Sequence, residues 1–393
     1  MSLRAPVASA AVPIAETKLP KVGTTIFTVM SALAQEHGAL NLSQGFPDFD
    51  GPEALLDRVT HYLKSGRNQY PPMTGVPSLR EAVAAKVRDL YGAQVDADAG
   101  VTVTSGATEA LFCAIHAVVR PGDEVIVFDP AYDSYEPAVE LAGGRCVHLP
   151  LRAPDFAVDW DAVRDAITPA TRLIIVNSPH NPTGAVFTEA DLDALEAVVA
   201  DTGIFLLSDE VYEHIVFDGA PHQSLLRREA LAARAFVVSS FGKTYHVTGW
   251  KVGYCVAPPA LSAEFRKVHQ YVTFTTITPV QLALADFLAE CPEHHLELPA
   301  FYQAKRDLLA SLLADSRFTF TPSAGTYFQL VDYSAITDEA DVDLVRRLTI
   351  DHGIAAIPVS VFYETPPAQR VLRLCFAKDD ATLEQAAERL CAI

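Results

Sequence analysis

The hydrophobic positions of the chain show two different spacings in two parts of the sequence. In the first hundred residues apolar side chains recur every three or four positions, which predicts amphipathic helices over Thr25–His37 and residues 53–64. Two Gly- and Pro-rich segments, residues 42–52 and 68–75, are predicted to be loops. Residues 1–22 are rich in Pro and Ala without a period, and we expect an arm that is ordered only by docking onto another surface.

From about residue 100 short β-branched runs alternate with helical windows. This alternation is typical of an α/β fold with a mostly parallel sheet and helices on both faces, whose ligands bind beyond the carboxyl ends of the strands. The predicted strands are Val101–Thr104, Glu124–Phe128, Arg145–Leu149, Arg172–Val176, Ile204–Ser208, Phe236–Ser239 and Val252–Val256. The predicted helices include Thr108–Val119, Ser134–Ala142, Ala162–Ile167 and Glu189–Ala200.

Beyond about residue 290 the alternation weakens and predicts a smaller α+β lobe. At 393 residues, the chain is long enough for two or three domains or lobes. Helices are predicted at 299–315, 340–350 and from 380, and strands at 317–321, 326–331 and 371–376. The predicted domains are an arm with part of the small domain (1–50), a large domain (51–289) and a C-terminal small domain (290–393).

Charge and composition narrow the possible partners. With 30 basic and 49 acidic side chains the formal net charge is −19, and no block of Lys and Arg occurs, so nucleic acid and anionic membranes are not expected as partners. No apolar run approaches the roughly 20 residues of a membrane helix. The six cysteines form no C-x-x-C pair, the histidines, including His294-His295, show no metal spacing, and the N-terminus does not resemble a signal peptide. We expect a soluble, cytoplasmic protein without a metal site.

One lysine stands out, because a buried strand leads directly to it. The apolar run Phe236–Val238 gives way to a turn that presents Lys243. Burial lowers the pKa of an ammonium group and leaves a fraction of neutral amine, as Schiff-base formation requires. Ser240 and Lys251 could bind a phosphate at the same turn. Taken alone, however, S-x-x-K is more often a surface loop with solvated lysines.

Polar residues also follow other predicted strands. The turn at Ser105–Glu109 opens a helix whose free N–H groups could bind an anion, unless Ser105 or Thr108 simply caps that helix. In the loop Asn177–Gly184 two prolines fix the direction of Asn177 and Asn181, and an Asx turn without a ligand is the alternative.

Asp209 ends an apolar strand, where a carboxylate needs a partner. That partner could be a protonated pyridine nitrogen, with Tyr212 near the same ligand, or an arginine of the fold. Tyr132 could stack on a flat heteroaromatic ring or pack in the core. Arg373 interrupts the apolar strand VLRLCFA and needs a carboxylate, which could belong to a substrate or to the fold.

Together these motifs resemble the class I/II aminotransferases of PLP fold type I, from about Gly23 to the C-terminus. The motifs are Tyr132, N-x-x-x-N-P (177–182), D-x-x-Y (209–212), S-x-x-G-K (239–243), G-W-K-x-G (249–253) and Arg373. The stretches TTIFTVMSALA, LSQGFPDFDGP and NQYPPMTG look closest to bacterial methionine aminotransferases, which in turn are similar to kynurenine/glutamine transaminases. The resemblance implies a homodimeric enzyme with pyridoxal 5′-phosphate (PLP) as cofactor, in a large domain with a central sheet between helices and a smaller α+β domain.

Carried over residue by residue, the resemblance also implies roles. Lys243 would be the Schiff-base lysine, and Asp209 would pair with the pyridinium nitrogen. Tyr212 and Asn181 would lie near the phenolic oxygen with Asn177 close by, and Tyr132 would stack on the ring. The phosphate would be held by Ala107, Thr108, Ser240, Lys251 and, from the neighbouring subunit, Tyr70. The substrate α-carboxylate would be held by Arg373, Asn181 and the backbone of Gly45. In place of Lys251 the broader family more often has arginine.

The mechanism so implied is a ping-pong transfer by way of pyridoxamine phosphate, with Lys243 as general base and acid. An apolar pocket formed by Phe46, Tyr70, the partner's Phe274 and Ile14 or nearby arm residues would favour methionine and apolar or aromatic amino acids, although some of these rings could instead only pack the dimer interface. One alternative is a kynurenine/glutamine transaminase with cysteine-S-conjugate β-lyase activity. A remote alternative is a PLP-binding regulatory protein, which would need an added DNA-binding domain.

Overall fold

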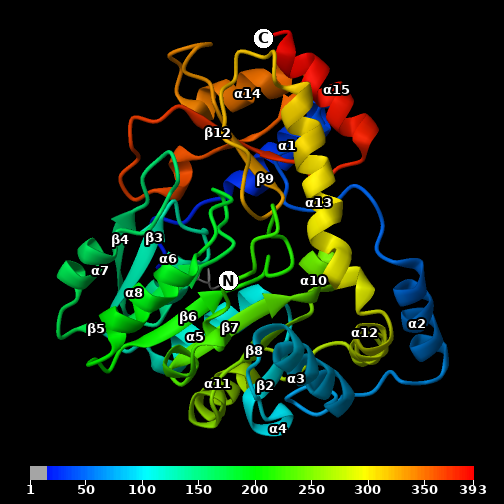
Figure 1. Cartoon of the computed structure of the whole chain (residues 1–393), viewed down its shortest axis with the longest axis vertical. Helices are drawn as coiled ribbons and strands as arrows, with labels where there is room; N and C mark the ends of the chain where they lie inside the picture. Colours follow the sequence, from blue (N-terminus) through cyan, green and yellow to red (C-terminus); the bar gives the residue numbers. More distant parts are fainter. Residues whose placement is uncertain (1–15) are drawn as a thin grey trace, which may run out of the picture.

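The computed structural model describes residues 16–393, and its centre is a seven-stranded sheet in the order β2-β8-β7-β6-β5-β3-β4 (Figure 1). Strand β8 runs antiparallel to both of its neighbours, and the other pairs are parallel, so the prediction of a mostly parallel sheet is confirmed. The strands are β2 (Val101–Thr104), β3 (Glu124–Asp129), β4 (Arg145–Pro150), β5 (Thr171–Asn177), β6 (Phe205–Asp209), β7 (Ala235–Ser240) and β8 (Gly253–Val256).

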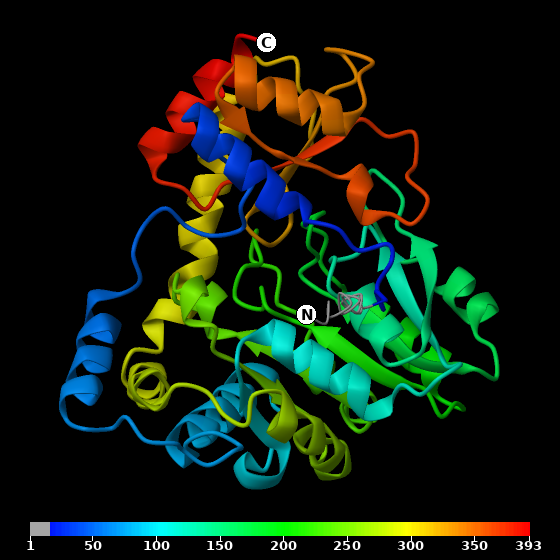
Figure 2. The same cartoon turned by 180° about the vertical axis from the view of Figure 1, so that it is seen from behind.

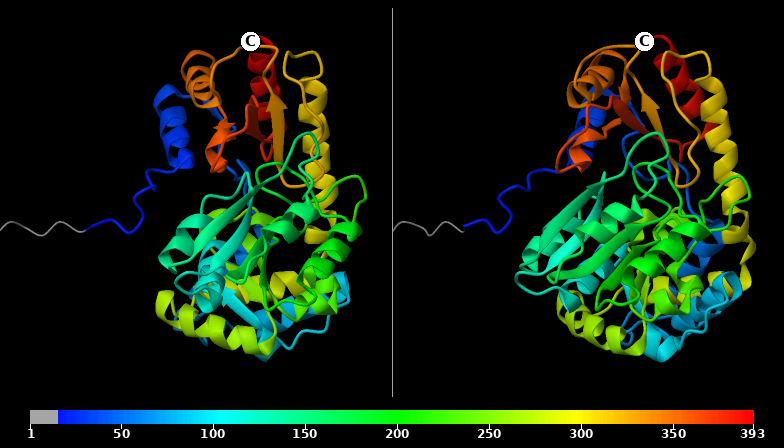
Figure 3. Two further views of the ribbon diagram at one scale, coloured as in Figure 1. Left: turned by 90° about the vertical axis from the view of Figure 1, so that its left-hand side faces the viewer. Right: turned by 60° about the vertical axis from the view of Figure 1, so that its left-hand side comes forward.

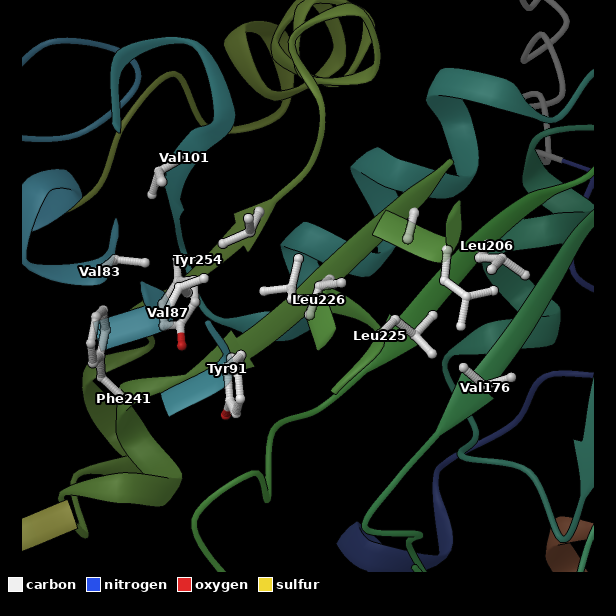
Figure 4. Close-up of a cluster of buried hydrophobic side chains, with 14 of the residues drawn as sticks. Val83, Val87, Tyr91, Val101, Val176, Leu206, Leu225, Leu226, Phe241 and Tyr254 are labelled. Atoms are coloured by element: carbon white, nitrogen blue, oxygen red, sulfur yellow. The ribbon is translucent and has the colours of Figure 1, made fainter. Parts of the chain in front are cut away.

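Helices cover both faces of this sheet, which explains why its central strands β5, β6 and β7 contain continuous apolar runs. In β5, Leu173 and Ile175 pack into one core, and Ile174 and Val176 pack into the core on the opposite face. The first of these cores lies under α5 (Ala107–Val118), α6 (Tyr135–Leu141) and α11 (Pro259–Val272). The second is formed with α2 (Glu53–Lys64), α3 (Pro77–Tyr91), α7 (Trp160–Ala166), α8 (Glu189–Val199) and α12 (Thr278–Glu290), and Figure 4 shows part of it.

A smaller lobe lies at one end of the molecule, above the sheet in Figure 3. It contains the antiparallel sheet β11-β12-β9 and the parallel pair β1-β10. Its helices surround a third core, and α1 lies beside α14 in the view from behind (Figure 2). The elements are α1 (Ile26–His37), β1 (Leu40–Asn41), α13 (Glu293–Leu312), β9 (Phe328–Asp332), α14 (Asp341–Asp351), β10 (Ile354–Ala355), β11 (Ile357–Pro358), β12 (Val371–Cys375) and α15 (Asp380–Cys391).

The prediction of a strand at residues 317–321 is wrong. Within this segment only Thr319 forms a β-bridge, and its partner is Asp332 at the end of β9. The side chain of Gln329 replaces the next backbone bonds, because its amide donates to the carbonyl of Thr321 at 2.8 Å and accepts from the N–H of Ser323 at 3.1 Å. The Gln329 side chain therefore forms the hydrogen bonds that a neighbouring strand backbone would form in a sheet.

Helix α13 begins at Glu293, six residues earlier than predicted, and continues through Pro299. An interior proline removes one helical hydrogen bond and costs about 3 kcal/mol. Leu298 and Tyr302, which flank it, are buried in the third core and offset that cost. The first turn faces the other lobe, where His294 Nε2 lies 3.0 Å from the carbonyl oxygen of Thr244. One helix is therefore bonded to both lobes.

Two further helices, α11 and α12, were not predicted individually. Among the helices within residues 16–393, none combines the length and the apolar character that a membrane crossing requires.

Candidate active site

A cavity of about 150 Å³ opens at the carboxyl ends of the parallel strands. Its lining brings together most of the residues singled out in the sequence. The lining residues are Gly106, Ala107, Thr108, Leu111, Tyr132, Asn177, Asn181, Asp209, Val211, Tyr212, Ser240, Lys243, Thr248 and Lys251. Of the predicted site residues, Gly45, Tyr70, Phe274 and Arg373 are not part of this lining.

Strand register explains how residues distant in the sequence meet here. Asn177 ends β5 directly opposite Asp209, which ends the neighbouring strand β6. Ser240 ends β7 opposite Gly253, just after Lys251. The carboxyl ends of the parallel strands β5, β6 and β7 meet at one edge, and the antiparallel strand β8 begins at that edge, so the sheet assembles this side of the cavity.

Lys243 lies on the single turn of α10 (Phe241–Thr244) that follows β7. Its Nζ donates to the carbonyl oxygen of Gly45 and to the hydroxyl of Tyr327, both at 2.9 Å. Burial lowers the pKa of Lys243 from 10.5 to about 8. The lysine is therefore not a solvated surface group, and roughly one tenth of it is neutral amine near pH 7.

Asp209 is buried, and its partner is not the arginine considered as the alternative. The hydroxyl of Tyr135 donates to Asp209 Oδ2 at 2.7 Å, and the N–H of Val211 reaches Oδ1 at 3.3 Å. Burial nevertheless raises the pKa of Asp209 to about 6. The sequence analysis missed Tyr135, although it lies three residues after Tyr132 in DPAYDSY, at the start of α6.

The start of α5 forms an anion-binding corner. Its N-cap is Gly106, which has φ 80° and offers no side-chain cap, so the alternative that Ser105 or Thr108 caps this helix is wrong. A Cβ added to Gly106 would lie 3.3 Å from Lys251 Nζ. Free N–H groups at a helix start, with a lysine beside them, suit a phosphate.

The two asparagines of the 177–184 loop differ in what they bind. Asn177 is committed to the loop, because its Nδ2 donates to the carbonyl of Asp209 at 2.8 Å and its Oδ1 accepts from the N–H of Asn181 at 2.8 Å. The Oδ1 of Asn181 instead accepts from Arg373 Nη1 at 2.8 Å. Asn177 thus fixes the loop, and Asn181 links the cavity to Arg373.

Arg373, in β12, is 1% exposed. Its Nη2 donates to the carbonyl of Ser43 at 2.7 Å, its guanidinium lies 3.9 Å from the ring centre of Phe328, and its Nε has no partner. Within residues 16–393 no carboxylate forms a salt bridge with it, so the fold does not supply the expected carboxylate. A buried cation without a counter-ion suits an anionic ligand.

The smaller lobe contributes the other side of the site. The carbonyl oxygen of Gly45 accepts from both Lys243 and Tyr327, the latter at 2.5 Å. Tyr327 is fully buried and was missed in the sequence, where AGTYF carries no chemical signature. Phe46, beside Gly45, is 43% exposed.

The remaining predicted lining residues lie elsewhere. Tyr70 is 85% exposed and its ring packs edge-on against Phe274, with ring centres 5.7 Å apart. Both lie outside the cavity described above. Ile14 lies outside the described residues.

Residues 38–390 match the family described as aminotransferase class I and II, and the chain belongs to this family. Enzymes of this family depend on PLP. The cavity fits that group, because an uncapped helix start, a lysine with a lowered pKa and a buried carboxylate with a raised pKa face one space.

Individual relatives resemble the chain along nearly its whole length. It is 58% identical to a methionine aminotransferase of Escherichia coli over 96% of this chain and 98% of the relative. A crystal structure from Escherichia coli, reported to identify a methionine aminotransferase function, superposes with a TM-score of 0.95 at 57% identity and covers 97% of this chain and 100% of that one. A human kynurenine–oxoglutarate transaminase is more distant, at 32% identity over 91% of this chain and 93% of the relative.

Proposed function

We propose that the chain transfers the amino group of methionine, and of aromatic or other apolar amino acids, to a 2-oxo acid. The observation that carries the reaction class is the amine of Lys243, half-buried at a cavity wall that also holds Asp209 and Tyr212. The similarity to a methionine aminotransferase at 58% identity supports the substrate.

The catalytic roles follow from charge and position. When bound, PLP supplies an electron sink for the charge that develops at the substrate α-carbon. Lys243 Nζ would take the proton from that carbon as general base and deliver it as general acid to the C4′ carbon of the cofactor. Asp209 would keep a proton on the ring nitrogen of the cofactor, and Tyr135 orients its carboxylate through the 2.7 Å bond. Tyr212 and Asn181 would donate hydrogen bonds to the phenolic oxygen of the cofactor.

Other residues bind rather than react. The N–H groups of Ala107 and Thr108, with Ser240 and Lys251, hold the phosphate. Tyr132 covers the ring by stacking.

Substrate selection is assigned to the smaller-lobe side. Arg373 binds the α-carboxylate, because its guanidinium is buried and has no carboxylate partner in the described chain, and Asn181 and Gly45 complete that contact. The exposed ring of Phe46 offers an apolar wall that suits methionine better than aspartate.

A half-reaction screen tests this function. PLP-loaded protein is mixed with each amino acid singly, and the absorbance of the bound cofactor is followed. We expect methionine and the aromatic amino acids to react fastest, and equal or faster reaction with aspartate contradicts the substrate assignment. A Lys243→Ala variant is expected to lose at least about 10⁴-fold in turnover, because nucleophile and base are removed together.

We also propose that the enzyme is a homodimer in which Tyr70 reaches the phosphate in the neighbouring subunit. Support comes from an exposed apolar group beside Tyr70, because such groups mark protein interfaces. The exposed apolar side chains of this region are Tyr70, Tyr271, Val272, Phe274 and Ile277.

Mixing two defective variants tests the shared site. In a hybrid of Tyr70→Phe and Lys243→Ala, one site combines an intact lysine with the intact Tyr70 of the other subunit. Random exchange is then expected to restore about one quarter of wild-type activity, since half of the dimers are hybrid and each has one complete site. If Tyr70 acts within its own subunit, mixing restores nothing.

Two further expectations belong to this proposal. Domain limits of 1–50, 51–289 and 290–393 are supported by the separate cores, because α12 packs with the larger sheet and α13 with the smaller lobe. A cytoplasmic location is supported by six cysteines that are all free thiols.

A further inference from the structure

Tyr327 contacts Lys243 from the smaller lobe and has no role in the reaction as described so far. Its hydroxyl donates to the carbonyl oxygen of Gly45 at 2.5 Å and accepts from Lys243 Nζ at 2.9 Å. The same carbonyl also accepts from Lys243 Nζ at 2.9 Å. The lysine amine therefore meets two oxygens that both act as acceptors toward it.

Hydrogen-bond chemistry fixes these directions. A hydroxyl has one proton, and Tyr327 gives it to Gly45, so only its lone pairs remain for Lys243. A carbonyl oxygen has two lone pairs and can accept from both residues. Burial raises the pKa of Tyr327 well above its usual value, which keeps this proton on the hydroxyl.

A neutral amine has two hydrogens and one lone pair. When Lys243 donates both hydrogens to Gly45 and Tyr327, tetrahedral geometry turns the lone pair away from these oxygens. Lys243 lines the cavity, whereas neither Gly45 nor Tyr327 does. The lone pair that accepts a proton therefore points into the reaction space.

The ring of Tyr327 is held rigidly enough for this task. It is 0% exposed. It packs edge-on against Tyr212 with ring centres 5.0 Å apart, and its ring is tilted against that of Tyr302 at 5.6 Å. At Gly45 a Cβ would come within 2.8 Å of Phe328 Cζ, so the backbone there is closely confined. Packing therefore fixes the positions of both acceptor oxygens independently of the Lys243 amine.

We propose that Tyr327 is a positioning residue that, with the Gly45 carbonyl, aims the lone pair of the Lys243 amine at the reacting carbon. This inference rests on the proposed function and adds the group that orients its base. Both acceptors belong to the smaller lobe, since Tyr327 packs in its core and Gly45 lies just beyond β1. The direction of the base is therefore tied to the position of that lobe.

The test compares Tyr327→Phe with Tyr302→Phe as a matched control. Both tyrosines are fully buried, and each substitution removes one hydroxyl, but the hydroxyl of Tyr302 lies 2.9 Å from His246 Nδ1 and does not contact the lysine. In full-length protein stripped of cofactor, competitive labelling with acetic anhydride and mass spectrometry measure the pH midpoint of Lys243. In the loaded enzyme, kcat and KM are measured separately.

An acceptor stabilises the ammonium more than the amine, so its removal is expected to lower the Lys243 midpoint by about half a pH unit or more. In the loaded enzyme Tyr327→Phe is expected to lower kcat at least about tenfold with KM changed less than about threefold. Tyr302→Phe is expected to leave the midpoint and kcat near wild type.

An unchanged midpoint or an unchanged kcat in Tyr327→Phe overturns the inference, as does an equal effect in Tyr302→Phe. If Tyr327→Phe does not fold, 3-fluorotyrosine is incorporated at position 327, which keeps the ring and weakens the acceptor. This replacement should lower the Lys243 midpoint by less than Tyr327→Phe would. An unchanged midpoint contradicts the inference. If the loaded wild type transfers no amino group, the proposed function fails, and the labelling result still decides how Lys243 is held.

Discussion

The two sides of the active site are built in different ways. The sheet side consists of residues at or just beyond strand ends and at the start of α5, such as Asp209, Ser240 and Thr108, which strand register alone brings together. The smaller-lobe side consists of Gly45, Tyr327 and Arg373, which meet through long-range contacts such as that between Arg373 and Ser43. The first side is arranged to hold the cofactor, and the second to hold substrate and to aim the lysine.

After Lys243→Ala, the largest expected effect concerns the sheet side, in Asp209→Asn. Loss of the charge that keeps the ring nitrogen protonated is expected to lower kcat about 10²- to 10³-fold. Steady-state kinetics with methionine measure it. If kcat instead stays within about threefold of wild type, the sheet side does not govern the chemistry of the cofactor.

The same variant should be more stable without cofactor at high pH. The pKa of Asp209 is raised to about 6 in the folded protein, so folding favours the protonated form, and stability is lost as pH rises through that pKa. Asparagine cannot ionise, so the stability of Asp209→Asn relative to wild type should rise by about 2 kcal/mol between about pH 4 and pH 8. Urea unfolding at both pH values measures this, with the exposed Asp201→Asn as control.

An intermediate effect is expected on the smaller-lobe side, in Arg373→Gln. Loss of the buried cation should lower kcat/KM about 10²-fold, mainly through KM, because a carboxylate loses its charged partner. Arg370→Gln is the control, since Arg370 forms an ion pair with the exposed Asp338 near the same strand. A fall in kcat without a change in KM would contradict a role of Arg373 in substrate binding and would indicate a role in catalysis.

The smallest effect is expected from Gly106→Ala, which tests the phosphate corner. Gly106 has φ 80°, and an added Cβ would lie 3.2 Å from Lys251 Cε, so alanine should weaken PLP binding about tenfold through strain and crowding. Fluorescence titration with PLP measures the Kd. Gly122→Ala is a matched control with φ 90° and open space around it, and equal weakening there would mean that the effect is not local.

The same contrast explains what could be predicted from sequence. Asp209 and Lys243 each follow an apolar run, and a parallel sheet brings such strand ends together, so their meeting could be expected from the pattern. Arg373 could be recognised as unusual, but its lack of a carboxylate partner depends on packing between lobes. Tyr327 gives no signal in the sequence, because a tyrosine in an apolar strand is most often core.

Errors in the predicted elements have similar causes. The segment 317–321 alternates like a strand, yet the Gln329 side chain binds its backbone in place of a ladder. Helix α13 continues through Pro299 because packing of the flanking residues outweighs the lost bond. In both cases a tertiary contact overrides a local preference.

Helix α13 also has a consequence for how the molecule comes apart. His294 is bonded to the large lobe at Thr244, and further along the same helix Tyr302 and Leu309 are packed in the smaller lobe. Unfolding of either lobe would therefore remove contacts that hold α13 in place, and the other lobe packs against the same helix. Heating should therefore produce one cooperative calorimetric transition in place of two, although the cores themselves are separate.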